Sequence, residues 1–151
     1  MRIKSVLLTM LLLAVPFLSF AEDANQLRKE IMMDQKRLIV MDNMELTEAE
    51  GQAFWPVYEK LQEELFQVNQ RGAKLILAYA AAYQTLTDEQ AVKLIDEYYD
   101  IQDERLTVMK KMASDVGKVL PGKKAFRYLQ IDSKLSAIGR YELAKAIPLA
   151  Q

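Results

Sequence analysis

The sequence predicts an all-α protein of four helices, with a long, bent antiparallel hairpin at its centre. Apolar residues recur at helical spacing through nearly all of the chain beyond its N-terminal segment, and this spacing accounts for every position that would suit a strand. A helix-start motif also occurs twice, as Leu46–Glu50 and Leu86–Gln90, at a spacing of 40 residues. The function of such a chain is therefore expected on a helical surface rather than in a catalytic pocket.

The N-terminal segment, residues 1–21, has the features of a secretory signal peptide. A basic start is followed by a mostly apolar stretch and by the small-x-small cleavage site Ser19-Phe20-Ala21. We expect cleavage after the alanine and export to the periplasm, which leaves a single domain over residues 22–151. The alternative is a membrane anchor, which needs about 20 apolar residues; here the run is short and contains Pro16. No integral membrane segment is expected after cleavage.

Charge and cysteine content exclude two classes of protein. Removal of Arg2 and Lys4 takes the formal net charge from −1 to −3, with basic and acidic residues interspersed, which argues against a nucleic-acid-binding protein. The chain has no cysteine, so neither disulfides nor thiol chemistry can contribute. The exported protein must therefore be held together by packing alone.

The first two helices are predicted from the apolar spacing and its interruptions. Apolar residues recur without Gly or Pro from about Asn25 to Met41, and Asp42-Asn43 then breaks the run. The second helix is predicted from Thr47 to about Tyr83. Pro56 lies inside it and lacks an N–H group, so we expect a bend between Gln52 and Pro56. The apolar stripe of this helix comprises Phe54, Val57, Tyr58, Leu61, Leu65, Val68, Leu75 and Tyr79.

The third and fourth helices complete the chain. The third is predicted from Thr87 to about Gly117, which is a typical helix stop. The fourth begins near Pro121 and ends before Pro148. The Thr85-Leu86 junction is short, so the second and third helices must form an antiparallel hairpin. The third stripe comprises Leu94, Ile95, Tyr98, Ile101, Leu106, Met109, Met112 and Val116, and the fourth helix would bury Phe126, Tyr128 and Tyr141 if it packs across the hairpin.

Each repeated motif predicts a capping box. A Thr precedes an acidic first turn and is followed three residues later by Glu50 or Gln90. The Thr hydroxyl can accept a hydrogen bond from a free backbone N–H of the first turn, and the longer side chain can reach back to the Thr amide. The motifs therefore predict that Thr47 and Thr87 are the capping residues of the second and third helices.

A signal peptide, an all-helical chain and two LTxxQ-type motifs that open successive helices resemble the Spy/CpxP family of bacterial periplasmic proteins, which includes envelope-stress chaperones. The likeness covers about Leu27 to Val116. It implies a cradle-like homodimer that holds unfolded or partly folded envelope proteins without ATP or a cofactor. The alternative is a regulator that docks on the periplasmic domain of an envelope-stress sensor kinase. The motif residues are Leu46, Thr47, Glu50, Leu86, Thr87 and Gln90, and only Glu50 departs from the pattern, where it replaces Gln.

Four residues are candidates for contact with a client or partner: Met32, Met33, Trp55 and Met109. Flexible methionine side chains suit surfaces that bind many partners. Met32 and Met33 are adjacent on a helix and face different directions, so we expect at least one of them to be incompletely buried. A solitary Trp beside a bend can anchor a partner. The competing interpretation for Trp55 and the methionines is core packing, which is the commoner role of such side chains.

Enzymatic and metal-binding functions have no support in the sequence. The chain has no His and no Cys, so it lacks the usual nucleophile–base pairs and the usual ligands for zinc, copper or nickel. We expect no catalytic residue, cofactor or metal. An acidic run on the third helix and a basic cluster around the start of the fourth are interpreted as solvated faces, although the basic cluster could contact an anionic partner. The acidic run is Asp96, Glu97, Asp100, Asp103 and Glu104, and the basic cluster is Lys118, Lys123, Lys124 and Arg127.

Overall fold

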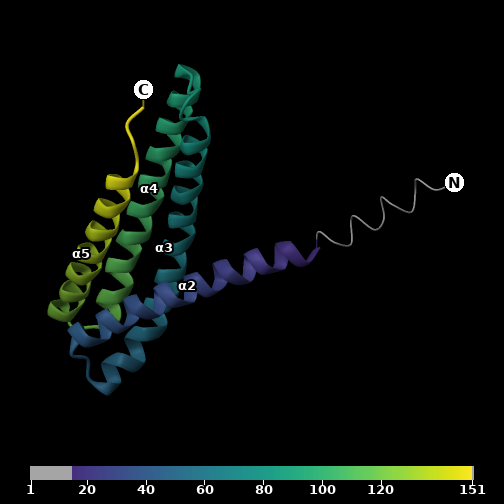
Figure 1. Ribbon diagram of the computed structural model, residues 1–151. Coiled ribbons are helices and arrows are strands. Elements are labelled where there is room, and N and C mark those ends of the chain that lie inside the picture. Colours follow the sequence, from purple (N-terminus) through teal and green to yellow (C-terminus); the bar gives the residue numbers. More distant parts are fainter. Residues whose placement is uncertain (1–14, 151) are drawn as a thin grey trace. The chain divides into compact units, whose positions relative to one another are not determined.

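The computed structural model describes the backbone of residues 15–150 and the side chains of Gln26, Leu27 and residues 29–150. The predicted signal peptide lies largely outside this range. Within the described residues the chain contains helices and no strand, so the predicted all-α class is confirmed (Figure 1). The four helices are α2, Val15–Met44; α3, Glu48–Ala82; α4, Asp88–Val119; and α5, Gly122–Ala146.

The chain divides into two compact units, Met1–Asp42 and Asn43–Gln151. The first contains most of α2, which begins ten residues before the predicted start at Asn25. Pro16 lies in this helix at the edge of the described residues. Cleavage after Ala21 would remove the first turns of α2.

The end of α2 differs from the prediction. The helix continues through Asp42-Asn43 and ends at Met44. The next residue, Glu45, has a φ of 50°, a left-handed conformation that is common immediately after a helix. The chain therefore stops the helix by backbone geometry at Glu45 rather than by the polar pair before it.

Both predicted capping boxes are present in the second unit. At the start of α3, Glu50 N donates to Thr47 Oγ1 at 3.3 Å, and Thr47 N donates to Glu50 Oε2 at 2.8 Å. At the start of α4, Gln90 N donates to Thr87 Oγ1 at 3.2 Å, and Thr87 N donates to Gln90 Oε1 at 3.0 Å. The two motifs therefore start two successive helices in the same way.

The helices α3 and α4 form the predicted antiparallel hairpin (Figure 1). Helical structure continues on both sides of Pro56. In Figure 1 the blue N-terminal part of α3 is inclined to its teal remainder, in agreement with the bend that a proline produces. Helix α5 then runs back along α4.

The end of α4 differs from the predicted one. Gly117 does not stop α4, which continues to Val119 and ends at Leu120 with an extended backbone. Gly117 has no positive φ, so it does not act as a left-handed cap. Pro121 lies just before α5 as its N-cap, close to the predicted position.

The buried core of the second unit lies in one half of the hairpin, which we call the basal half: residues 43–68, 101–132 and the turns between them. Every buried side chain of α3 precedes residue 69, and every buried side chain of α4 follows residue 100. The distal half, residues 69–100, has none. The largest buried side chains of the basal half are Met44, Phe54, Leu61, Val68, Met112, Val116, Tyr128 and Asp132.

Aromatic rings and a few polar groups organise this core around Tyr128. Its ring lies 5.1 Å from that of Phe54 and 6.0 Å from that of Tyr58. The hydroxyl accepts a hydrogen bond from Gln62 Nε2 at 3.1 Å and donates to Met112 Sδ at 3.2 Å. Burial raises the pKa of Tyr128 well above its ordinary value, and Asp132 adds to the shift. The phenol therefore stays protonated and joins α3, α4 and α5.

Candidate binding groove on the distal hairpin

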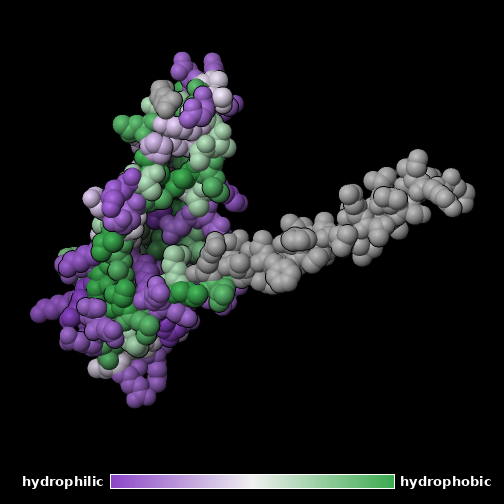
Figure 2. All heavy atoms as spheres, viewed as in Figure 1, coloured by the Kyte–Doolittle hydropathy of each residue, from purple (hydrophilic) through white to green (hydrophobic). Residues whose placement is uncertain are grey.

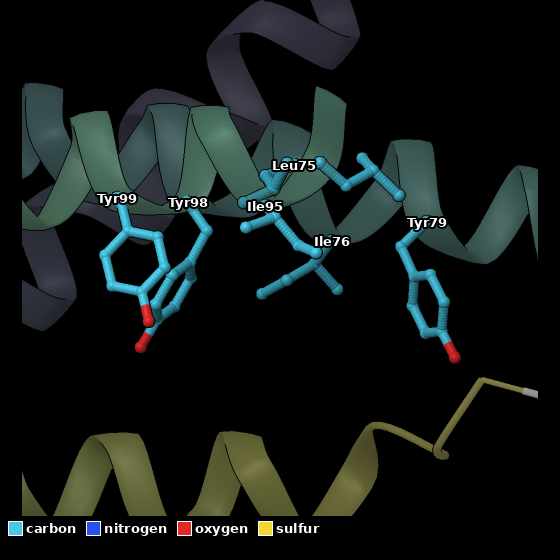
Figure 3. Close-up of a pocket in the computed structure, with 7 residues that line it drawn as sticks. Leu75, Ile76, Tyr79, Ile95, Tyr98 and Tyr99 are labelled. Atoms are coloured by element: carbon cyan, nitrogen blue, oxygen red, sulfur yellow. The ribbon is translucent and has the colours of Figure 1, made fainter. Parts of the chain in front are cut away.

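The distal half of the hairpin carries an open apolar groove of about 430 Å³. It is built from α3 and α4 only, and its rings and branched chains point to the same side of the hairpin (Figure 3). Helical spacing accounts for this arrangement, because residues three or four apart share a face. The lining residues are Leu75, Ile76, Tyr79, Leu94, Ile95, Tyr98 and Tyr99.

The groove is open because no third helix is seated on it. Side chains central to its lining remain accessible, with Ile95 54% exposed and Tyr99 63% exposed. Helix α5 passes opposite the groove (Figure 3), but its own apolar side chains are also accessible, and Tyr141 is 65% exposed. Two helices alone cannot cover the apolar stripe that each carries, so the stripe that forms a core in the basal half becomes a surface in the distal half.

Hydrophobic surface is visible over this face of the second unit. Figure 2 shows green side chains over the distal hairpin and along α5, separated by purple hydrophilic ones. Exposed apolar side chains gathered in one groove are candidates for a binding surface.

Tyrosines give the groove its shape and one polar contact. The rings of Tyr98 and Tyr99 meet edge to face with centroids 5.3 Å apart. Those of Tyr79 and Tyr83 are 5.8 Å apart. Tyr79 Oη donates a hydrogen bond to the Pro148 carbonyl at 3.0 Å, which holds the segment after α5 at one end of the groove. Burial raises the pKa of Tyr79, so its hydroxyl remains a donor at neutral pH.

Ion pairs across the hairpin position α3 against α4 beside the groove. Arg71 on α3 donates to Glu97 at 2.8 Å and also contacts Glu104, and these two carboxylates raise its pKa. Arg105 donates to Asn69 Oδ1 at 2.7 Å. The acidic run of α4 is therefore only partly a solvated face, because Glu97 and Glu104 are engaged with Arg71. Asp96, Asp100 and Asp103 are exposed, as predicted.

Most of the basic cluster makes internal contacts. Lys124 donates to the Glu45 carbonyl at 2.9 Å and also contacts the Glu50 carboxylate. Arg127 pairs with the Glu45 side chain at 3.1 Å, and Lys118 pairs with Asp115 at 2.7 Å. Lys123 is exposed.

The four residues predicted to contact a client do not line the groove. Met32 and Met33 belong to the first unit, where Met32 is exposed and Met33 is half-buried. Trp55 is half-buried in the basal aromatic cluster, 5.1 Å from Phe54 and 5.4 Å from Tyr58, and Met109 is half-buried on α4. A contact role for these four residues stays a prediction. Five groove residues were instead assigned to apolar stripes, because spacing alone does not reveal which part of a stripe is covered; these are Leu75, Tyr79, Leu94, Ile95 and Tyr98. Ile76 and Tyr99 were assigned to neither stripe.

The motif residues have a structural role as helix caps. Leu46 and Leu86 are half-buried beside them. Among the described residues, no acidic side chains are grouped so that they could hold a metal ion. Nor does any helix in the described range have the length and apolar character needed to cross a membrane.

Comparison with protein-family models, with curated proteins and with solved structures finds no match for this chain. The resemblance to the Spy/CpxP family therefore depends on the two motifs and the N-terminal segment, and it stays a prediction.

Proposed function

We propose that this protein is an exported, ATP-independent binding protein that holds unfolded or misfolded envelope proteins on a helical surface. The observation that carries the proposal is the open apolar groove on the distal hairpin. The N-terminal segment of residues 1–21, with its signal-peptide pattern, supports export to the periplasm.

The chemistry of the groove suits weak binding to many chains. Burial of apolar surface contributes about 25 cal/mol per Å² without directional requirements, so different apolar segments can occupy the same groove. Tyrosines add large contact surfaces at a low cost in conformational entropy. Binding of this kind needs no nucleotide, because release follows from the low affinity.

The test is light scattering from a chemically denatured model client diluted into buffer with the protein purified after export. We expect dose-dependent suppression of aggregation at near-stoichiometric amounts without ATP. The double variant Ile95→Ser/Tyr99→Ser should lose most of this suppression, because both side chains line the groove and are exposed, so their replacement leaves the core intact.

A matched control comes from the same two helices. Val92 is 56% exposed and Leu77 is 69% exposed, but neither lines the groove. The variant Val92→Ser/Leu77→Ser should keep the suppression. No suppression of aggregation by the wild-type protein at several-fold excess would overturn the proposal. Equal loss of suppression in the two double variants would show that the groove is not the binding surface.

The proposal includes the homodimer that the family resemblance implies. Its test is the molar mass by size-exclusion chromatography with light scattering at the concentrations of the aggregation assay. A monomeric mass would remove the dimer from the proposal and leave the groove as the binding surface.

A further inference from the structure

The α4 wall of the groove is strongly acidic. The segment 86–104, which comprises the α4 side of the distal half and the turn of α4 that follows it, contains seven carboxylates and a single lysine, Lys93. The α3 side, residues 69–85, contributes only two charged residues, Arg71 and Lys74. Arg71 is already paired with Glu97 and Glu104. The two helices that form the groove therefore present a net negative charge to an occupant.

Two of these carboxylates border the groove directly. Asp96 precedes Tyr99 by three residues and Asp103 follows it by four, so helical geometry places both beside the Tyr99 side chain. Both are exposed, and neither makes an ion pair with a residue that the structure describes. They are free to pair with cations of a bound segment.

The aromatic rings of the groove favour the same sign of charge. Tyr98 and Tyr99 are both exposed and lie edge to face. The face of a tyrosine ring attracts the ammonium of Lys and the guanidinium of Arg. A basic side chain that leaves the apolar floor of the groove thus reaches either a ring face or a carboxylate.

The chain itself carries a segment of this complementary chemistry opposite the groove. The second half of α5 contains Lys134, Arg140 and Lys145 against one acidic residue, Glu142. Its exposed apolar side chains include Ile138, Tyr141 and Leu143. Figure 3 shows α5 across from the groove, and the hydrogen bond from Tyr79 to Pro148 holds its end there. This half of α5 does not cover the groove, because its apolar side chains remain exposed, as do Ile95, Tyr98 and Tyr99 of the groove.

We propose that the groove binds amphipathic segments of client proteins in which apolar residues at helical spacing are flanked by Lys or Arg. The proposal depends on the binding function proposed above and narrows its client class. Acidic amphipathic segments bind more weakly, because they meet the carboxylates of α4 with like charge.

The test is fluorescence anisotropy with two labelled helical peptides of about 18 residues, a length suited to a groove-bound helix. One contains only Leu and Lys, and the other has Glu in place of every Lys. We expect the Leu/Lys peptide to bind more tightly and to lose affinity as NaCl is raised, since salt screens exposed charges. The variant Asp96→Asn/Asp103→Asn should weaken its binding roughly threefold to tenfold, the effect of two exposed charge pairs.

The control is Glu48→Gln/Asp115→Asn, which changes the net charge equally in the basal half and should leave peptide binding unchanged. Equal binding of the two peptides, or equal effects of the two double variants, would overturn the inference. In that case suppression of aggregation would still support the proposed function. Failure of the wild-type protein to bind either peptide, together with no suppression, would overturn both.

Discussion

Glu50 occupies the position in the first motif that Gln90 occupies in the second. Its carboxylate both caps α3 and contacts a lysine of α5. Both side chains accept a hydrogen bond from the amide of the capping Thr. The Glu50 carboxylate also contacts Lys124 of α5. Lys124 and then the Thr47 amide lower the pKa of Glu50 below its ordinary value of 4.5. The difference between the two motifs therefore has a physical reason in this chain.

We expect Glu50→Gln to keep the cap and to lose the contact with Lys124. A carboxyl whose pKa is lowered by folding stabilises the fold above its ordinary pKa, and this stabilisation disappears as the pH falls through the folded value. The wild-type protein should therefore be more stable than the variant at pH 7, and the difference should vanish in acid, well below pH 4.5. Urea unfolding of the wild-type protein and the variant, at pH 7 and in acid, measures this difference in the free energy of unfolding.

The control for this prediction is Glu48→Gln, which removes the same charge from the same helix turn. Glu48 accepts from Gln52 at 3.4 Å and has no contact with Lys124. If the stability difference between wild type and Glu48→Gln varied with pH as much as that between wild type and Glu50→Gln, the role of Lys124 would be contradicted.

At the scale of single elements, the starts of α3 and α4 were predicted better than the start of α2 and the ends of α2 and α4. The capping residues Thr47 and Thr87 begin α3 and α4 as the motif requires. The ends of α2 and α4 were misplaced, because Asn43 and Gly117 have residue types common after helices but helical backbones here. A capping box is a hydrogen-bonded structure within four residues, whereas a helix end without such a motif is poorly defined by its own residue types.

We expect Gly117→Ala to stabilise the protein by about 0.5–1 kcal/mol, because Gly is the poorer helix former. Gly117 lies inside α4 without a positive φ, and a Cβ there meets no atom within 4 Å. Thermal and urea unfolding measure the change. Gly72→Ala, which is also in open space within a helix, should give a similar gain. Destabilisation by Gly117→Ala alone would show that Gly117 does act as a cap.

At the scale of the second unit, stability is concentrated in the basal half. Phe54, Met112 and Tyr128 are fully buried there, whereas no residue from 69 to 100 is. The distal half is held by helical hydrogen bonds and by partly exposed ion pairs such as Arg71 with Glu97, each of which contributes little. A binding surface at the distal end can thus adapt while the basal core keeps its packing.

Hydrogen exchange should separate the two halves. Amides of residues 73–98 should exchange through local opening, at a free energy well below that of global unfolding. Amides of α3 and α4 in the basal half should exchange only with global unfolding, because many buried side chains oppose their opening. Equal protection along the whole hairpin, measured by mass spectrometry or NMR, would contradict this division.

The sequence alone determined the all-α class, the antiparallel hairpin and the starts of α3 and α4. These features depend on interactions within a few residues, such as the bond from Glu50 N to Thr47 Oγ1. The assignment of Phe54 and Tyr58 to the core was also predicted from spacing and is confirmed. Local hydrogen bonds and helical periodicity are sufficient for such predictions.

Only the tertiary structure decided which part of each apolar stripe becomes a surface. Leu61 and Leu75 belong to the same predicted stripe, yet Leu61 is buried and Leu75 lines an open groove. Likewise, Tyr128 is buried as predicted, whereas Phe126 and Tyr141 are exposed. The physical reason is that burial depends on where α5 lies against the hairpin. That position is set by contacts between residues far apart in the chain, such as Gln62 with Tyr128 and Glu50 with Lys124.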